Sequence, residues 1–123
     1  MPSREPLITV EALSVTYPNG VKALDEVSVE IPTGARVALV GSSGSGKSTL
    51  VKALLGLLPI GSEVTGRVEV TGIDMVHGDP ERIRAARGLV VGYIAQDPYA
   101  ACDPLRSIRH HIEAAWRMHR LRP

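Results

Sequence analysis

The sequence is poor in cysteine and in aromatic residues. Its single cysteine, Cys102, excludes an internal disulfide and a cluster of thiolate metal ligands, so the reducing cytosol is the simplest compartment. The 123 residues include no Phe, one Trp and three Tyr, which leaves little for an aromatic platform that would stack on single-stranded nucleic acid. The composition therefore argues against a disulfide-stapled scaffold and against an aromatic nucleic-acid binder.

A strong charge of one sign and a long apolar run are also missing. The net charge is +1 and the pI is about 8.0, so no overall basic field predicts binding to nucleic acid or to an anionic membrane. The first ten residues lack the apolar segment of a signal peptide. The most apolar stretch contains Lys52 and stops at Pro59, which is far short of a membrane span. We expect a soluble chain that could still sit on a membrane partner.

The first third of the chain predicts antiparallel β structure. Residues 7–17 alternate, with Leu7, Thr9, Glu11, Leu13, Val15 and Tyr17 on one parity. A Pro-Asn-Gly turn follows, and residues 23–31 alternate again. A third alternating strand is predicted at residues 66–70. Two neighbouring alternating strands joined by a tight turn favour a small antiparallel layer.

The pattern then changes to that of an α/β protein. Residues 37–40 and 89–95 are continuous apolar runs, as expected for strands buried on both faces of a parallel sheet. A helix is predicted between them, from the end of a glycine-rich loop to Gly56 and Pro59. A second helix is predicted from Asp79-Pro80-Glu81 to Gly88, and an amphipathic helix from about Arg106.

The glycine-rich loop, residues 41–48, carries the chemistry. Its sequence GSSGSGKS fits the pattern G-x-x-x-x-G-K-S/T, with a predicted strand before it and a helix after it. Glycines let successive backbone N–H groups turn toward a phosphate, and the helix start adds free N–H groups and a positive dipole end. Lys47 can span the β- and γ-phosphates and the Ser48 hydroxyl can bind Mg²⁺. The loop predicts binding of a nucleoside triphosphate, most simply Mg·ATP.

The loop and its surroundings resemble the ATP-binding subunits of ABC transporters. The loop extends to GSSGSGKSTL, the form typical of that family, and about 35 residues of β structure precede it. Tyr17 stands 24 residues before Gly41, where the family has an aromatic residue that stacks on adenine. Gln96, 49 residues after Lys47, lies in VVGYIAQDP, which resembles the family's Q-loop. Small P-loop kinases, by contrast, generally lack the long β lead-in.

The resemblance assigns roles to particular residues. Lys47 and Gln96 are the expected catalytic residues, and Gln96 would also reach Mg²⁺ and the attacking water. Ser48 and Gln96 are the expected metal contacts. The expected nucleotide-binding residues are Tyr17, Gly41, Ser42, Ser43, Gly44, Ser45, Gly46, Lys47, Ser48 and Thr49.

Two alternatives compete for other polar residues. Asp97 ends an apolar run and could be a Walker B aspartate that holds Mg²⁺, although Pro98 and not a second carboxylate follows it. His77 with Asp74 and Asp79 could form a metal site, but a polar loop and a helix cap explain these residues better. The histidines after residue 109 are expected on a solvated basic helix face.

The resemblance implies a fold and partners. It implies a P-loop NTPase of the ABC type, with an antiparallel β lead-in at residues 1–34, a RecA-like core from Walker A to the Q-loop at 35–97, and the start of a helical subdomain at 98–123. Within the family, the stretch QDPYAACDPLRSI resembles the oligopeptide, dipeptide and nickel importer group. The expected partners are transmembrane permease subunits and a second ATP-binding subunit, at the cytoplasmic face of the membrane, and no nucleic acid.

The family's signature sequence and Walker B strand do not follow Gln96, so a chain truncated before these elements is expected. We expect it to bind ATP weakly or not at all, and not to hydrolyse it alone. Residues 37–40 and 89–95 are expected to keep unpaired edges and exposed apolar faces. The remaining alternatives are a soluble ABC-type ATPase acting on DNA or ribosomes, a non-catalytic nucleotide-binding module, and a small P-loop kinase.

Overall fold

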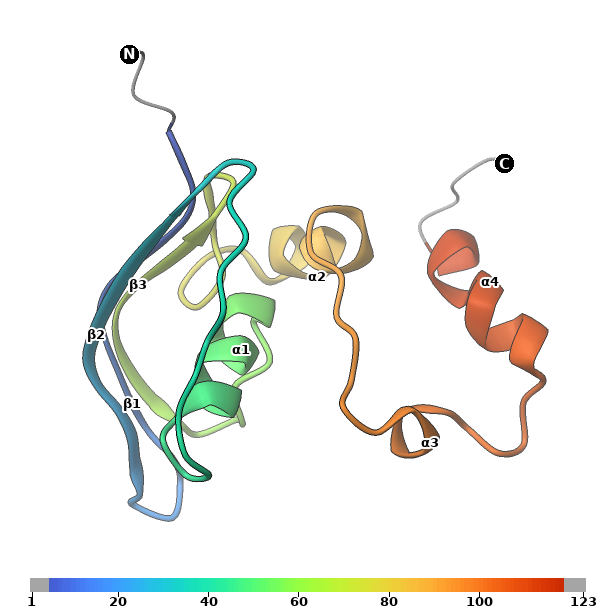
Figure 1. The fold of residues 1–123 in the computed structure, drawn as a ribbon, viewed down its shortest axis with the longest axis horizontal. Coiled ribbons are helices and arrows are strands. Elements are labelled where there is room, and N and C mark those ends of the chain that lie inside the picture. The colour runs from blue at the N-terminus through green and yellow to red at the C-terminus, as the bar shows by residue number, and fades with distance from the viewer. Residues whose placement is uncertain (1–4, 119–123) are drawn as a thin grey trace. The chain divides into compact units, whose positions relative to one another are not determined.

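A computed structural model describes residues 5–118, and the chain divides after Arg84 into two compact units. The first unit contains a four-stranded sheet with the order β2-β1-β3-β4, in which all neighbours are antiparallel (Figure 1). The strands are β1 (Pro6–Thr16), β2 (Lys22–Pro32), β3 (Glu63–Val70) and β4 (Ile73–Asp74). The three strands predicted from alternation are confirmed; β3 starts three residues earlier than predicted, and β4 was not predicted.

The alternation of β1 is interrupted by a β-bulge, so its buried residues do not all lie on one parity. Val10, Leu13 and Val15 are the buried residues, whereas Leu7 and Glu11 are exposed. Val10 pairs with Val29 and Leu13 with Val27, so two residues of β1 oppose one of β2 and the parity of β1 changes there. In the bulge, the Ala12 N–H donates to Ser28 Oγ at 2.8 Å.

Gly66 of β3 faces the same bulge. A Cβ at this position would lie 2.3 Å from the Ala12 carbonyl oxygen, and Gly66 has a φ of +92°. Only glycine permits both the backbone conformation and the close approach. The pairing of β1 with β3 is irregular at this place, between the pairs Glu11–Arg67 and Ser14–Thr65.

Helix α1 (Lys47–Leu55) packs on the sheet and completes the core of this unit (Figure 1). Its buried hydrophobic residues are Leu50, Ala53 and Leu55, and α1 contacts β2 and β3. The helix ends at Gly56, which has a left-handed conformation and whose N–H donates to the Ala53 carbonyl. The predicted helix and its end are confirmed.

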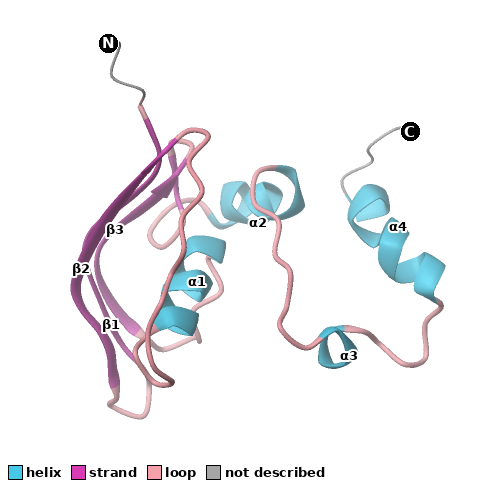
Figure 2. Cartoon of the chain, in the orientation of Figure 1, coloured by secondary structure: helices cyan, strands magenta, loops and turns pink. Residues whose placement is uncertain are grey.

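The two predicted parallel strands are wrong. Residues 33–46 contain no strand. In residues 89–95, Leu89 ends a helix and Val91 forms an isolated bridge with Arg87, but no strand is present (Figure 2). Val40 is 88% exposed and Ile94 is 97% exposed, so the expected exposure of these apolar runs is confirmed. A strand needs a hydrogen-bonded neighbour, and within residues 5–118 no strand pairs with either run. Local apolarity alone did not produce the parallel sheet of the expected core.

The rest of the described chain consists of three helices joined by loops (Figure 2). It contains α2 (Pro80–Leu89), α3 (Pro98–Ala101) and α4 (Ile108–Met118). Regular geometry in α2 breaks at Arg87 and Gly88, and Gly88 has a φ of +89°, so the predicted end at Gly88 marks the end of the regular helix. The amphipathic terminal helix is confirmed as α4, where Ile108 and Ile112 remain exposed.

Candidate functional site

The glycine-rich loop connects the long segment after β2 to the first turn of α1. Gly44 and Gly46 have φ values of +80° and +96°, which L-residues with a side chain rarely adopt. Within the same loop, the Ser45 N–H donates to the Ser42 carbonyl at 3.1 Å and closes a tight turn. A Cβ on Gly41 would lie 2.6 Å from Ser45 Oγ, so this first glycine also permits the turn. The motif glycines thus occupy positions that require glycine.

The first turn of α1 supplies the hydrogen-bond donors of the site. Gly46 is the N-cap, and the first intrahelical bond runs from the Leu50 N–H to the Gly46 carbonyl at 3.0 Å. The backbone N–H groups of Lys47, Ser48 and Thr49 therefore lie in the part of a helix that has no intrahelical acceptor. Such an end attracts an anion through its free donors and its dipole. The first turn contains no acidic side chain that would oppose this attraction.

The Lys47 side chain returns over the loop from which the helix starts. Its Nζ donates to the carbonyl oxygens of Gly41 and of Ser42, the latter at 3.1 Å. The positive charge is thereby held at the same loop as the free N–H groups of α1. Ser42, Ser43 and Ser48 are exposed at this place, so a phosphate has access to it. The arrangement suits a polyphosphate, with Lys47 as a charged donor and the Ser48 hydroxyl available to Mg²⁺.

Two contacts fix the loop against the β1–β2 hairpin. A Cβ on Gly46 would lie 2.7 Å from both the Ala23 carbonyl oxygen and Leu24 Cδ2, so the backbone of the loop touches β2 directly. The Tyr17 hydroxyl forms a hydrogen bond of 2.5 Å with Thr49 Oγ1, and Thr49 is only 4% exposed. The hairpin therefore brings Tyr17 to the first turn of α1.

The structure brings together Tyr17 and Thr49, two of the residues that the sequence predicted for the nucleotide site. The contact itself was missed, because no pattern in the sequence relates two hydroxyls that are 32 residues apart. The role of Tyr17 in stacking on a base stays a prediction.

Gln96 lies in the second unit, in an exposed bend between Val91 and α3. Its role beside Mg²⁺ and water stays a prediction. The neighbouring Asp97 is the N-cap of α3, and its carboxylate accepts the Tyr99 N–H at 3.0 Å and the Ala100 N–H at 3.3 Å. This cap accounts for Asp97 without a metal. The available signal was Asp97-Pro98, which repeats the Asp-Pro helix start at residue 79.

The polar residues of the alternative metal site have local partners. One oxygen of Asp74 accepts the Val76 N–H at 3.0 Å and the His77 N–H at 2.9 Å, and Asp79 accepts the Glu81 N–H at 3.2 Å. Burial alone would raise the pKa of Asp74, but these backbone bonds and the nearby charges of His77 and Arg67 lower it below its usual value. Within residues 5–118 no group of three His, Cys, Asp or Glu side chains is placed to hold a metal ion.

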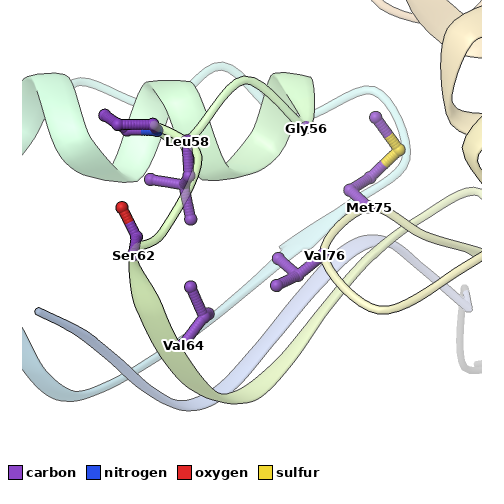
Figure 3. A pocket seen from close by; sticks show the side chains of 7 residues that line it. Gly56, Leu58, Ser62, Val64, Met75 and Val76 are labelled. Atoms are coloured by element: carbon purple, nitrogen blue, oxygen red, sulfur yellow. The ribbon is translucent and has the colours of Figure 1, made fainter. Parts of the chain in front are cut away.

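A separate pocket of about 190 Å³ lies at the other end of α1 (Figure 3). It is lined by Gly56, Leu58, Pro59, Ser62, Val64, Met75 and Val76. Ser62 Oγ is buried and has no hydrogen-bond partner. Helix α1 has nine residues, so its two ends lie about 13 Å apart at the usual rise per residue. The pocket is therefore distinct from the loop at residues 41–48.

Comparison with known proteins gives a family and several relatives. The ABC transporter family model matches residues 24–122. The probable D,D-dipeptide transport ATP-binding protein DdpD of Escherichia coli K12 is 37% identical over 120 residues, a match that covers 87% of this chain and 37% of DdpD. The oligopeptide transport ATP-binding protein OppD of Mycobacterium tuberculosis is 34% identical over 120 residues, covering 95% of this chain and 20% of OppD. This chain thus spans little more than a third, or less, of these relatives.

Two further comparisons extend this picture. The phosphonates import ATP-binding protein PhnC of Bdellovibrio bacteriovorus is 42% identical over 84 residues, covering 68% of this chain and 31% of PhnC. A solved structure of a bacterial Atm1-family ABC exporter with ATP bound has a TM-score of 0.55 and 31% identity, and the match covers 70% of this chain and 15% of the exporter chain. No helix within residues 5–118 is long and apolar enough to cross a membrane.

Proposed function

Because this chain belongs to the ABC transporter family, we propose that it is the phosphate-binding part of an ATP-binding subunit of an importer. The observation that carries the proposal is the loop at residues 41–48, where Lys47, the free N–H groups of α1 and the exposed Ser48 hydroxyl converge. ATP would bind with its β- and γ-phosphates at these groups. Mg²⁺, bound by the Ser48 hydroxyl, would neutralise part of the phosphate charge. Tyr17 would support the adenine, and Gln96 would orient water.

Peptide or nickel import is the proposed transport class. DdpD and OppD are named for dipeptide and oligopeptide transport, which supports the peptide class, while PhnC is named for phosphonates. The nickel alternative depends on the importer-like stretch after Gln96. In this proposal the subunit works at the cytoplasmic face of the membrane, on permease subunits and with a second ATP-binding subunit. Import names among the relatives favour this class over a DNA-acting ATPase or a small kinase.

Titration of the isotope-labelled chain with Mg·ATP, followed by backbone amide NMR, tests the binding. We expect dissociation constants on the order of millimolar and shifts concentrated at residues 41–49. Lys47→Ala should weaken binding about 10- to 100-fold, because it removes charge-assisted hydrogen bonds. Lys52→Ala is the matched control, since it removes the same charge from an exposed position of the same helix.

Two outcomes would contradict the proposal. Shifts that survive Lys47→Ala, or that fall outside the loop, would show that the nucleotide binds elsewhere. We also expect no steady ATP hydrolysis by this chain alone, because the proposed site needs a second subunit to complete it. Hydrolysis that Lys47→Ala abolishes would overturn that part of the proposal.

A further inference from the structure

The first turn of α1 lacks the usual means of holding a helix start in place. Its N-cap is Gly46, which offers no side-chain oxygen, and no side chain caps the turn. The turn nevertheless presents the free N–H groups on which phosphate binding depends. Its only side-chain hydroxyl that is buried belongs to Thr49, and that hydroxyl is bonded to Tyr17. The hydrogen bond between Tyr17 and Thr49 therefore helps to hold a helix start that has no side-chain cap.

We propose that Tyr17 is a positioning residue for phosphate binding, acting through Thr49 independently of any contact with a base. This inference rests on the proposed function, since it concerns the same loop. The Tyr17 hydroxyl holds Thr49 and with it the backbone N–H groups of residues 47–49 in the orientation that a phosphate needs. Without the phenol oxygen, the Thr49 hydroxyl is left buried and unpaired, and the first turn must shift or fray to satisfy it.

The position of Tyr17 makes this coupling specific. Tyr17 begins the β1–β2 turn, and its N–H donates to the Val21 carbonyl at 2.9 Å, so its backbone is fixed by the hairpin. The loop touches the same hairpin where Gly46 meets Ala23. The hydroxyl bond and the backbone contact together hold the helix start against this hairpin. The ring of Tyr17 and its hydroxyl then have separate duties, and separate substitutions can remove them.

Sodium tripolyphosphate with Mg²⁺ separates these duties, because it has phosphates but no base. We expect Tyr17→Phe to weaken binding of tripolyphosphate about 2- to 12-fold, the range for one net hydrogen bond. ATP should be weakened by the same factor, since the ring remains. Tyr17→Leu should weaken ATP more than tripolyphosphate. Thr49→Val removes the other half of the bond, and adding Tyr17→Phe to it should cost less than a further twofold.

Ser14→Ala is the matched control. It removes one hydrogen bond from the same sheet, that from the Glu26 N–H at 2.9 Å, and should leave both dissociation constants unchanged. A general loss of stability would act on all variants alike and is thereby excluded. Unchanged or tighter binding of tripolyphosphate by Tyr17→Phe would overturn the inference and leave the proposed function standing. A wild-type chain that binds neither ligand would overturn both.

Discussion

Gly46→Ala tests whether the loop owes its placement to direct contact with β2. The substituted Cβ would lie 2.7 Å from the Ala23 carbonyl oxygen, closer than real Cβ atoms come to such an atom. The oxygen belongs to the backbone of β2, so it cannot move aside as a flexible side chain could. Either the loop and the start of α1 must shift away from the sheet, or β2 must bend.

The magnitude has two parts, and Gly44→Ala isolates the first of them. Both glycines have positive φ, and placing an L-residue there costs roughly 1–2 kcal/mol. A Cβ on Gly44 meets nothing within 4 Å, so this variant carries only the backbone cost. Gly46→Ala adds the steric conflict, which is comparable to overpacking and costs about 1–3 kcal/mol. We therefore expect the free energy of unfolding of Gly46→Ala to be lower than that of Gly44→Ala by about 1–3 kcal/mol.

Thermal unfolding followed by circular dichroism measures the difference. For a unit of the size of residues 1–84, which contains both glycines, 1 kcal/mol corresponds to about 4–8 °C in Tm, so Gly46→Ala should melt at least about 4 °C below Gly44→Ala. A Gly46→Ala chain that is unfolded while Gly44→Ala remains folded agrees with the reasoning. Equal Tm values for the two variants would refute it, because the contact between the loop and β2 would then carry no energy.

Two further predictions concern other parts of the chain. The pKa of Asp74 is lowered in the folded state, so its contribution to stability is present above about pH 4 and is lost as the pH falls through the lowered value. Asp74→Asn should therefore reduce the loss of unfolding free energy at acid pH, as measured by urea unfolding at a series of pH values. An unchanged dependence on pH would contradict this prediction. Ile94 is 97% exposed, so Ile94→Lys should leave the Tm unchanged and reduce self-association in light scattering. The same change at the fully buried Val68 should unfold the sheet. A large loss of stability in Ile94→Lys would show that residues 89–95 are buried in solution.

Local patterns predicted the elements whose partners are near in sequence. Alternation predicted β1 and β2, and the tight turn between them makes these strands neighbours in the sheet. The cap residues around Asp79 and Gly56 predicted where the helices begin and end. The inward face of β1 could not be read from alternation, because the bulge changes its parity. Gly66 inside a strand pattern was the available signal, since such a glycine often marks a bulge or a close backbone approach.

The candidate site was predictable in its parts but not in its assembly. The loop motif alone gave Lys47 and the helix start, because their chemistry depends on contiguous residues. The contact of Tyr17 with Thr49 depends on how the hairpin meets α1, and no local rule fixes that distance. The approach of Gly46 to β2 was hidden for the same reason. Tertiary packing supplied what periodicity could not.

The unpaired segment before the loop explains why weak nucleotide binding is expected. Residues 37–40 lead directly into Gly41, yet no sheet hydrogen bonds hold them and Val40 is 88% exposed. On the other side, the loop is held by β2, by Tyr17 and by α1. A bound triphosphate must therefore order the entry to the loop, at about 1–2 kcal/mol for each residue fixed. Over a few residues this cost rivals the free energy of millimolar binding, about 4 kcal/mol. A strand paired with residues 37–40 would fix their backbone already in the absence of nucleotide. The same loop would then bind ATP more tightly without any new contact to the phosphates, because binding would no longer have to order these residues.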